Sequence, residues 1–321
     1  MTPLGTLRII KPGLLTTVQD LGRWGHQLDG VPVAGPMDAF SHRLANHLVG
    51  NPPQAALLEI TLIGPEILAE TPVTLVVCGA DFDITCDGDA VHTGATFHVR
   101  QGQVVRFGRR HRGARAYLAI AGGGVLTPPL LGSRATHLLS RMGGLDGRAL
   151  LAGDVLPVAG DVDRPPARAR GLTLPSAGRA RLRVVPGSQS DWFGEDAWRA
   201  LTTVSFHISP RSNRMGYRLQ GPPLPRRTEG EPISEPLAMG AIQVPAAGEP
   251  ILLMADRQTA GGYPKIGYVI TADLCLAGQL APGEFIEFDR CSEREAVAAL
   301  IARERELMAQ MVSAGAGATR P

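Results

Sequence analysis

The sequence predicts a mainly β fold, and three observations support this prediction. The 321 residues include 39 glycines and 26 prolines, an excess that predicts many tight turns and therefore many short strands. Hydrophobic residues make up 44% of the chain, which is enough to bury a core. Short apolar runs recur between Gly-Pro, Asp-Gly and Gly-Gln turns, a spacing typical of an all-β barrel or sandwich.

The first half of the chain begins with a short strand that enters the turn at Pro12-Gly13. A helix is predicted over residues 37–49, because Phe40, Leu44 and Leu48 recur at helical spacing and Gly50 follows. The remaining predicted elements of this half are strands. They cover residues 57–63, 73–78, 82–86, 96–99, 104–107 and 116–121.

The apolar pattern stops at residues 159–180, where prolines and arginines gather, so residues 161–180 are predicted to be a linker. Strands resume beyond it, at residues 181–185, 203–208, 241–244, 251–254, 267–272 and 284–288. Ser292 and Glu295 form a capping-box pattern that opens a terminal helix. One apolar stripe is predicted on this helix, made of Val297, Leu300, Ile301, Leu307 and Met308. The small, polar residues 313–321 are expected to form a frayed tail.

Composition and missing motifs exclude several classes of protein. The 32 basic and 30 acidic residues nearly balance, so neither nucleic acid nor a membrane surface is an expected partner. The four cysteines are widely spaced, which argues against a metal site and fits a reducing cytoplasm. No signal peptide or membrane span is expected. The sequence contains no phosphate-binding P-loop, no G-x-S-x-G elbow and no H-E-x-x-H motif.

Three glycine-rich polar segments could hold a site. The first, residues 30–38, delivers Asp38 to the start of the predicted helix. Asp38 either stabilises the helix dipole or marks a helix start whose N–H groups face a ligand. The second segment, residues 212–219, contains Arg214 and Arg218. These arginines either clamp the oxygens of a carboxylate or phosphate, or tie down a loop through backbone carbonyls.

The third segment, residues 254–265, leaves an apolar strand and turns at Gly261-Gly262. Loops that leave rigid strands often contain sites, and the alternative is an ordinary solvated loop. Its polar side chains, with two from nearby in the sequence, are Asp256, Arg257, Gln258, Thr259, Tyr263, Lys265, Glu235 and Gln243. A site built from Glu235, Asp256, Arg214 and Lys265 could bind a small amide or lactam, although it has no obvious nucleophile of its own.

These three segments, with residues 12–23 and 44–51, resemble the allophanate hydrolase subunit 2 family. This family is also called the biotin-dependent carboxyltransferase family, or the family of the 5-oxoprolinase C subunit. The resemblance runs from about Leu7 to Ala298. Asn213 stands where the family usually has Asp, and Ala260 where Thr is common.

The resemblance implies a mainly β architecture of two subdomains. It divides the chain into a β-rich carboxyltransferase subdomain (1–160), the linker (161–180), a cyclophilin-like β-barrel (181–298) and the helix end and tail (299–321). It implies that the chain is a component of an ATP-dependent 5-oxoprolinase, the enzyme that converts 5-oxoproline to glutamate. The chain is expected to be inactive alone. The implied partners are a homologue of subunit 1, also called the B subunit, and a LamB/YcsF-type protein that forms the A subunit. ATP would be bound by or with a partner.

The alternatives are a carboxyltransferase component that uses an external biotin carrier, and a non-catalytic regulatory binding protein. No lysine here follows a methionine, so no attached biotin is expected. For lactam opening, Arg214 and Lys265 would stabilise an oxyanion or phosphate, and Asp256 and Glu235 would act as acid, base or metal-holding groups. The expected substrate-binding residues are Gln243 and Gln258, which would recognise the amide, with Thr259, Tyr263, Arg218 and Asp38.

Overall fold

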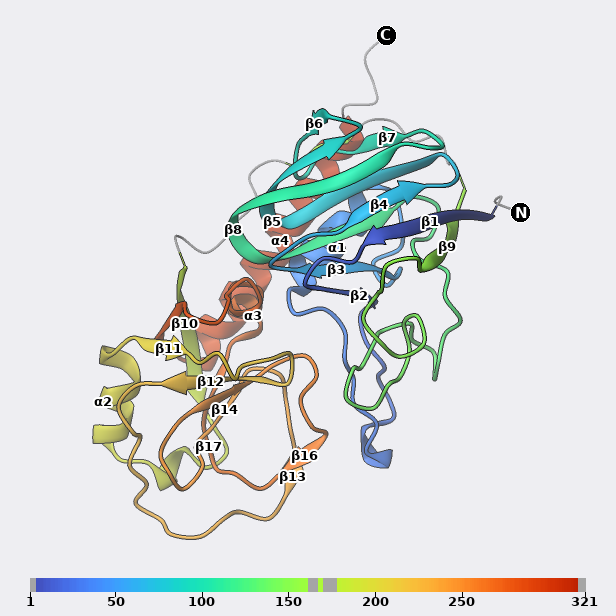
Figure 1. The fold of residues 1–321 in the computed structure, drawn as a ribbon. Helices are drawn as coiled ribbons and strands as arrows, with labels where there is room; N and C mark the ends of the chain where they lie inside the picture. Colours follow the sequence, from blue (N-terminus) through green and yellow to red (C-terminus); the bar gives the residue numbers. More distant parts are fainter. Residues whose placement is uncertain (1–3, 161–166, 170–177, 317–321) are drawn as a thin grey trace. The chain divides into compact units, whose positions relative to one another are not determined.

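The computed structural model describes residues 4–160, 167–169 and 178–316, which fall into two compact units. Described residues of Met1–Arg23, Ala34–Leu174 and Arg305–Pro321 make up the first unit, and those of Trp24–Val33 and Pro175–Glu304 the second. Strands dominate both units (Figure 1), so the prediction of a mainly β fold is confirmed. Most of the predicted linker at 161–180 lies outside the described residues, as do residues 317–321 of the predicted tail.

The first unit is a nine-stranded sheet whose main path runs β2–β3–β8–β4–β1–β9, while β5 pairs with β6, β7 and β8. Its strands are β1 (Leu4–Lys11), β2 (Leu15–Gln19), β3 (Leu57–Thr61), β4 (Glu66–Ala69), β5 (Val73–Cys86), β6 (Asp89–Val91), β7 (Phe97–Val99), β8 (Val104–Ile120) and β9 (Val155–Ala159). Their buried aliphatic side chains, among them Leu58, Leu75 and Leu118, form one core.

Two strands are longer than the sequence predicts. The separate strands expected at 73–78 and 82–86 join into β5, and those expected at 104–107 and 116–121 join into β8. Register shifts between Gly79 and Ile84 let the paired strands bulge and continue instead of ending. The charged run 109–112 therefore lies within β8, where its polar side chains face largely outward.

Helix α1 (Ala39–Leu48) covers most of the predicted range 37–49. The carboxylate of Asp38 accepts a hydrogen bond from the Ser41 N–H at 2.9 Å, so Asp38 is the N-cap rather than a first-turn residue. Leu44 and Leu48 are buried in a second core cluster that also contains Tyr117. The helix therefore begins at a side-chain cap and is held by its apolar face.

The second unit contains a closed barrel in the order β10–β17–β14–β15–β12–β11–β18. Its strands are β10 (Arg179–Pro186), β11 (Phe206–Ile208), β12 (Gly216–Gln220), β14 (Ala241–Gln243), β15 (Ile251–Leu253), β17 (Lys265–Val269) and β18 (Phe285–Arg290). Strands β13 (Glu235–Pro236) and β16 (Ala260–Gly261) form a separate ribbon. Much of the second polar segment (212–219) is thus part of barrel strand β12, and Arg218 lies within it.

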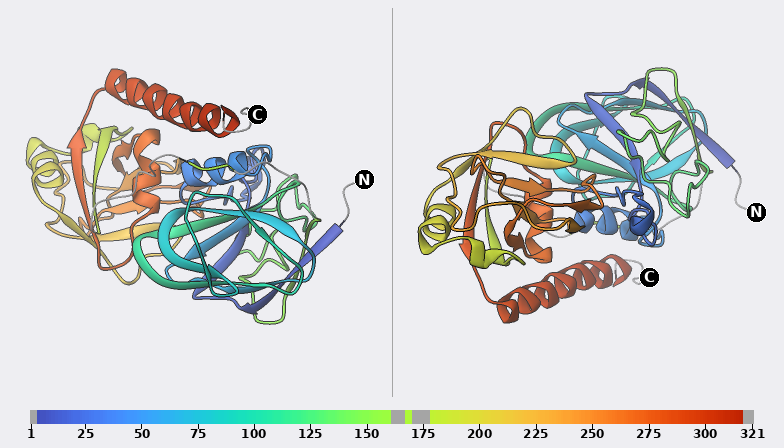
Figure 2. Two further views of the ribbon diagram at one scale, coloured as in Figure 1. Left: turned by 90° about the horizontal axis from the view of Figure 1, so that it is seen from above. Right: turned by 90° about the horizontal axis from the view of Figure 1, so that it is seen from below.

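Six helices complete the part of the chain that the structure describes. They are the 3-10 helices Gln27–Asp29, Ser190–Trp192 and Thr271–Asp273, with α2 (Glu195–Thr203), α3 (Leu274–Gly278) and the long α4 (Glu293–Ala316), which is uninterrupted in Figure 2. The predicted capping box is confirmed, because the Ser292 N–H donates to Glu295 Oε2 at 2.8 Å and the Glu295 N–H donates back to Ser292 Oγ at 3.3 Å. On the apolar stripe only Leu307 is buried, in the cluster around α1, while Val297, Leu300, Ile301 and Met308 are exposed.

Candidate functional site

Asp38 belongs to the first unit, whereas the other predicted site residues belong to the second. Besides capping α1, Asp38 donates its backbone N–H to Tyr117 Oη at 2.8 Å. Tyr117 Oη donates in turn to Glu59 Oε2 at 2.8 Å, and the Met37 N–H donates to the same oxygen. All four residues are buried, and burial raises the pKa of Tyr117. These polar groups bind one another, which matches the structural alternative for Asp38.

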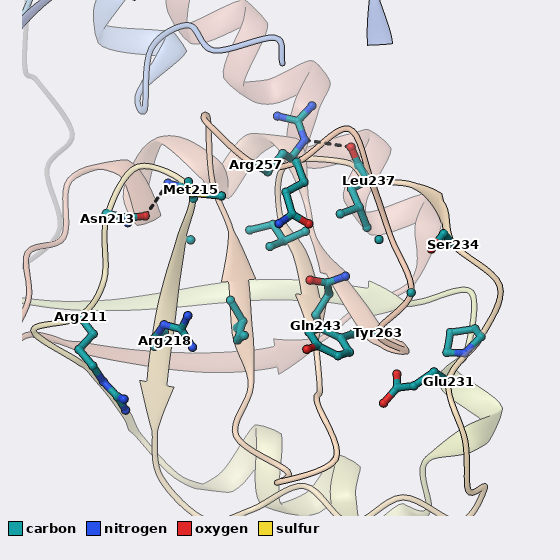
Figure 3. Close-up of a pocket in the computed structure, with 17 residues that line it drawn as sticks. Arg211, Asn213, Met215, Arg218, Glu231, Ser234, Leu237, Gln243, Arg257 and Tyr263 are labelled. Carbon is teal, nitrogen blue, oxygen red and sulfur yellow. Dashed lines mark hydrogen bonds between the residues drawn. The ribbon is translucent and has the colours of Figure 1, made fainter. Parts of the chain in front are cut away.

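A cavity of about 610 Å³ lies in the second unit (Figure 3). Both polar segments of this unit contribute to it, together with a third stretch around residue 234. Its lining residues are Arg211, Asn213, Met215, Gly216, Arg218, Glu231, Pro232, Ser234, Leu237, Gln243, Ile251, Leu253, Arg257, Gln258, Gly261, Gly262 and Tyr263. Four predicted site residues therefore share one cavity: Arg218, Gln243, Gln258 and Tyr263.

The cavity uses one face of strands β12, β15 and β14. Tyr217, Leu252 and Ile242 are the alternate positions on these strands; they are almost fully buried and do not line the cavity. On the cavity face, Arg218 and Gln243 both lie directly opposite Ile251, one on each neighbouring strand. The register thus places a cation, an apolar side chain and an amide in one row.

Gln243 is only 5% exposed, yet its side-chain amide has no hydrogen-bond partner among the residues that the structure describes. The amide lies within the group of cavity side chains drawn in Figure 3. A Cβ atom on Gly261 would lie 3.2 Å from Gln243 Nε2 and 2.9 Å from Leu237 Cδ1. The missing side chain at residue 261 therefore leaves room beside this amide.

Arg214 and Asp256 are buried side chains that pair with each other instead of lining the cavity. Arg214 Nε and Nη2 donate to the two carboxylate oxygens of Asp256, each at 2.9 Å. The Asp256 N–H also donates to the Arg214 carbonyl oxygen at 2.8 Å. A bidentate pair of this kind fixes geometry as well as charge, so it ties the second polar segment (212–219) to the third (254–265).

Lys265 and Glu235 form a second pair, and neither residue lines the cavity. Lys265 is fully buried, and its Nζ lies 2.6 Å from Glu235 Oε1. Hydrogen bonds from Lys265, Gln189 and Ser188 lower the pKa of Glu235 below its ordinary value. Glu235 is adjacent to Ser234, which lines the cavity, so this pair anchors that stretch of chain.

Arginine side chains give the cavity a positive charge. Those of Arg211 and Arg218 have no partner in the described part of the chain, and Arg257 Nε donates only to the Leu237 carbonyl oxygen, at 3.0 Å. Burial lowers the pKa of Arg257, and the nearby Asp256 carboxylate opposes this shift only in part. The acidic lining residue, Glu231, already faces Arg226 at 3.3 Å. The excess of cationic groups favours an anionic ligand.

Thr259 lies outside the cavity lining, and its carbonyl oxygen accepts a hydrogen bond from the Leu237 N–H. Sequence reasoning did not assign a site role to several lining residues, namely Arg211, Met215, Leu237, Ile251, Leu253 and Arg257. The apolar ones look like ordinary core residues in the sequence. They can be told apart from residues of the barrel interior only when the register of the strands is known, because alternate residues of a strand point to opposite faces.

Comparisons with known proteins agree with this fold. Residues 29–290 match the family described as carboxyltransferase domain, subdomain A and B. The chain is 41% identical over 293 residues to the 5-oxoprolinase C subunit of Escherichia coli, covering 91% of this chain and 94% of the relative. It is 36% identical over 291 residues to the 5-oxoprolinase C subunit of Haemophilus influenzae, covering 91% and 92%.

The crystal structure of Kluyveromyces lactis urea amidolyase superposes with a TM-score of 0.87 at 30% identity. The match covers 96% of this chain but only 20% of that much longer protein. This chain therefore belongs to the carboxyltransferase domain family, as the sequence motifs predict.

Two further observations bear on the type of site. Within the described ranges, no His, Cys, Asp and Glu side chains gather in a group of three or more that could hold a metal ion. None of the helices described is long and apolar enough to cross a membrane.

Proposed function

We propose that this chain is a component of an ATP-dependent 5-oxoprolinase and that the barrel cavity receives the lactam substrate. Two relatives that match it along almost their whole length are 5-oxoprolinase C subunits. The observation that supports a substrate site is the cavity itself. It combines an apolar floor with guanidinium groups and an amide that have no partner among the described residues. This combination suits a small, uncharged amide ring that carries an anionic group.

Opening a lactam requires activation of its carbonyl oxygen, and ATP turnover supplies that activation. We assign ATP to a partner protein, because this sequence has no P-loop. The partners we propose are a homologue of the B subunit and a LamB/YcsF-type A subunit, with the chain inactive alone and located in the cytoplasm. In this assembly the chain binds and orients the lactam. The pairs Arg214–Asp256 and Lys265–Glu235 hold the walls of the cavity and so act as positioning residues.

A second candidate function is carboxyl transfer with an external biotin carrier. The family description and the similarity to urea amidolyase favour it. Such an enzyme would use the cavity for urea or another small amide, and its biotin would be attached to a different chain.

The experiment is to purify the chain with its partner proteins and to measure ATP hydrolysis with 5-oxoproline, with urea and with buffer alone. Dependence on 5-oxoproline is expected, with glutamate as the product. Urea-dependent activity that avidin inhibits would establish the carboxyltransferase instead. Silence with every combination of partners would favour a regulatory binding protein and would contradict the proposal.

A further inference from the structure

Gln243 presents an unusual combination of burial and missing partners. A buried primary amide normally makes hydrogen bonds, because leaving its N–H and C=O groups unpaired costs free energy. Gln243 is only 5% exposed as a residue, lines the cavity, and has no side-chain hydrogen bond to any residue that the structure describes. The group is therefore available to a ligand.

The geometry of a primary amide selects the ligand. Its N–H and C=O lie side by side, so it can form two parallel hydrogen bonds with a group that also presents N–H and C=O on one edge. A small lactam ring holds its amide cis and has such an edge. An open-chain secondary amide is trans and presents the two groups on opposite sides. Gln243 would thus prefer a cyclic amide, although urea also offers a suitable edge.

Arg218 supplies the second point of recognition. It and Gln243 flank Ile251 in one row across β12, β15 and β14. With strands about 4.8 Å apart, their Cα atoms are about 10 Å apart. The Arg218 guanidinium is exposed at the cavity and unpartnered within the described residues, so it can receive a carboxylate bidentately. Ile251 provides an apolar surface between the two polar groups.

We infer that Gln243, Ile251 and Arg218 form a two-point recognition row for a cyclic amide that carries a carboxylate. Gln243 pairs with the amide edge, the ring lies on Ile251, and Arg218 binds the carboxylate. This inference rests on the proposed function and deepens it, because it separates 5-oxoproline from urea. Both compounds fit Gln243, and only 5-oxoproline has a carboxylate for Arg218.

The test compares two ligands on the assembled complex, 5-oxoproline and 2-pyrrolidinone, the same lactam without its carboxylate. Calorimetry gives the affinities, and steady-state kinetics gives KM and kcat for 5-oxoproline. Arg218→Ala should weaken 5-oxoproline binding by about 10-fold to 100-fold, the range for a charge-assisted hydrogen bond, and leave 2-pyrrolidinone within about twofold. Arg211→Ala is the matched control, because Arg211 also lines the cavity without a partner in the described structure but lies outside the row. It should change both affinities by less than about threefold if the row, and not net charge, binds the carboxylate.

A second set of variants tests the amide. Gln243→Leu should weaken both lactams by about 10-fold or more. Gly261→Ala keeps every polar group but crowds the Gln243 amide, so it should raise KM for 5-oxoproline in the same direction. Unchanged unfolding midpoints would show that these variants fold.

The outcomes separate the two proposals. If wild-type complex turns over 5-oxoproline while Arg218→Ala or Gln243→Leu keeps the wild-type KM, the recognition row is wrong and the proposed function stands. If the complex binds lactams in the expected pattern but never hydrolyses them, the row stands and the proposed function is wrong. Equal losses of both ligands in Arg218→Ala, or an equal loss in Arg211→Ala, would also overturn the row. Absence of both binding and turnover would overturn both proposals.

Discussion

The side chains of Tyr117 and Glu59 and the backbone of Asp38 are joined by hydrogen bonds, whereas the amide of Gln243 has no partner among the described residues. In the first region, Asp38, Tyr117, Glu59 and the Met37 N–H form a continuous set of hydrogen bonds. In the second region, Gln243 and Arg218 face a cavity without partners in the described structure. Both regions are polar and rich in glycine, so composition alone does not distinguish them.

The difference separates polar residues that maintain the fold from those open to a ligand. An unsatisfied buried polar group costs about 1–3 kcal/mol, so a protein keeps one where water or a ligand completes it. In the set around Asp38, the Asp38 side chain caps α1, and Tyr117 joins the Asp38 backbone to Glu59. The cavity region contains both kinds of residue. The ion pairs Arg214–Asp256 and Lys265–Glu235 satisfy each other, whereas Gln243 and Arg218 have no side-chain partner among the described residues.

The largest expected effect comes from opening a closed pair. Asp256→Ala should lower the free energy of unfolding of the second unit by about 3–5 kcal/mol, because it leaves the buried Arg214 guanidinium without its counter-charge. Urea unfolding at neutral pH measures this loss. The double variant Arg214→Leu/Asp256→Leu removes both charges and should cost less than the single change. A loss below about 1 kcal/mol for Asp256→Ala would show that the pair does not hold the cavity wall.

A pH dependence is expected from the first region, where one group is imperfectly satisfied. His42 Nδ1 is buried without a partner among the described residues, and burial lowers the pKa of His42 from 6.5 to about 4. Between these values the unfolded chain binds the proton and the folded chain does not, so stability falls as the pH drops from 6.5 to 4. A shift of this size corresponds to about 3 kcal/mol. Urea unfolding of wild type and of His42→Gln across this range should converge as the pH falls, and parallel curves would contradict the assignment.

Much of the fold and part of the site could be predicted from the sequence. Turn residues and apolar runs locate most strands, and the capping box at Ser292 locates α4. The side-chain partners could not be predicted, because they are set by tertiary distance. Arg214 meets an aspartate 42 positions away. Glu59 and Gln243 show the limit most clearly: each is a polar residue between two apolar residues in a strand, yet of the two only Glu59 has side-chain partners within the described residues.

A smaller effect is expected when a closed set is weakened without being broken. Glu59→Gln keeps an oxygen acceptor for Tyr117 and Met37 but removes the charge that strengthens both hydrogen bonds. The free energy of unfolding of the first unit should fall by about 1–2 kcal/mol, the difference between charged and neutral acceptors. Thermal and urea unfolding measure this, with lactam binding as the control that should not change. An unchanged free energy of unfolding would mean that the charge of Glu59 does not strengthen its hydrogen bonds with Tyr117 and Met37.

The smallest effect on stability is expected at Gln243. This prediction tests most directly whether Gln243, unlike Glu59, contributes little to the fold. Gln243→Leu removes an amide that has no partner in the described chain and leaves no described group unsatisfied, so the free energy of unfolding should stay within about 0.5 kcal/mol of wild type or rise slightly. The apolar neighbours Leu237 and Leu253 on the same cavity can pack against the new side chain. Urea unfolding without ligand measures this. A destabilisation as large as that of Glu59→Gln would mean that Gln243 supports the fold. In that case the distinction between closed and open polar regions would fail at the residue on which the recognition row depends.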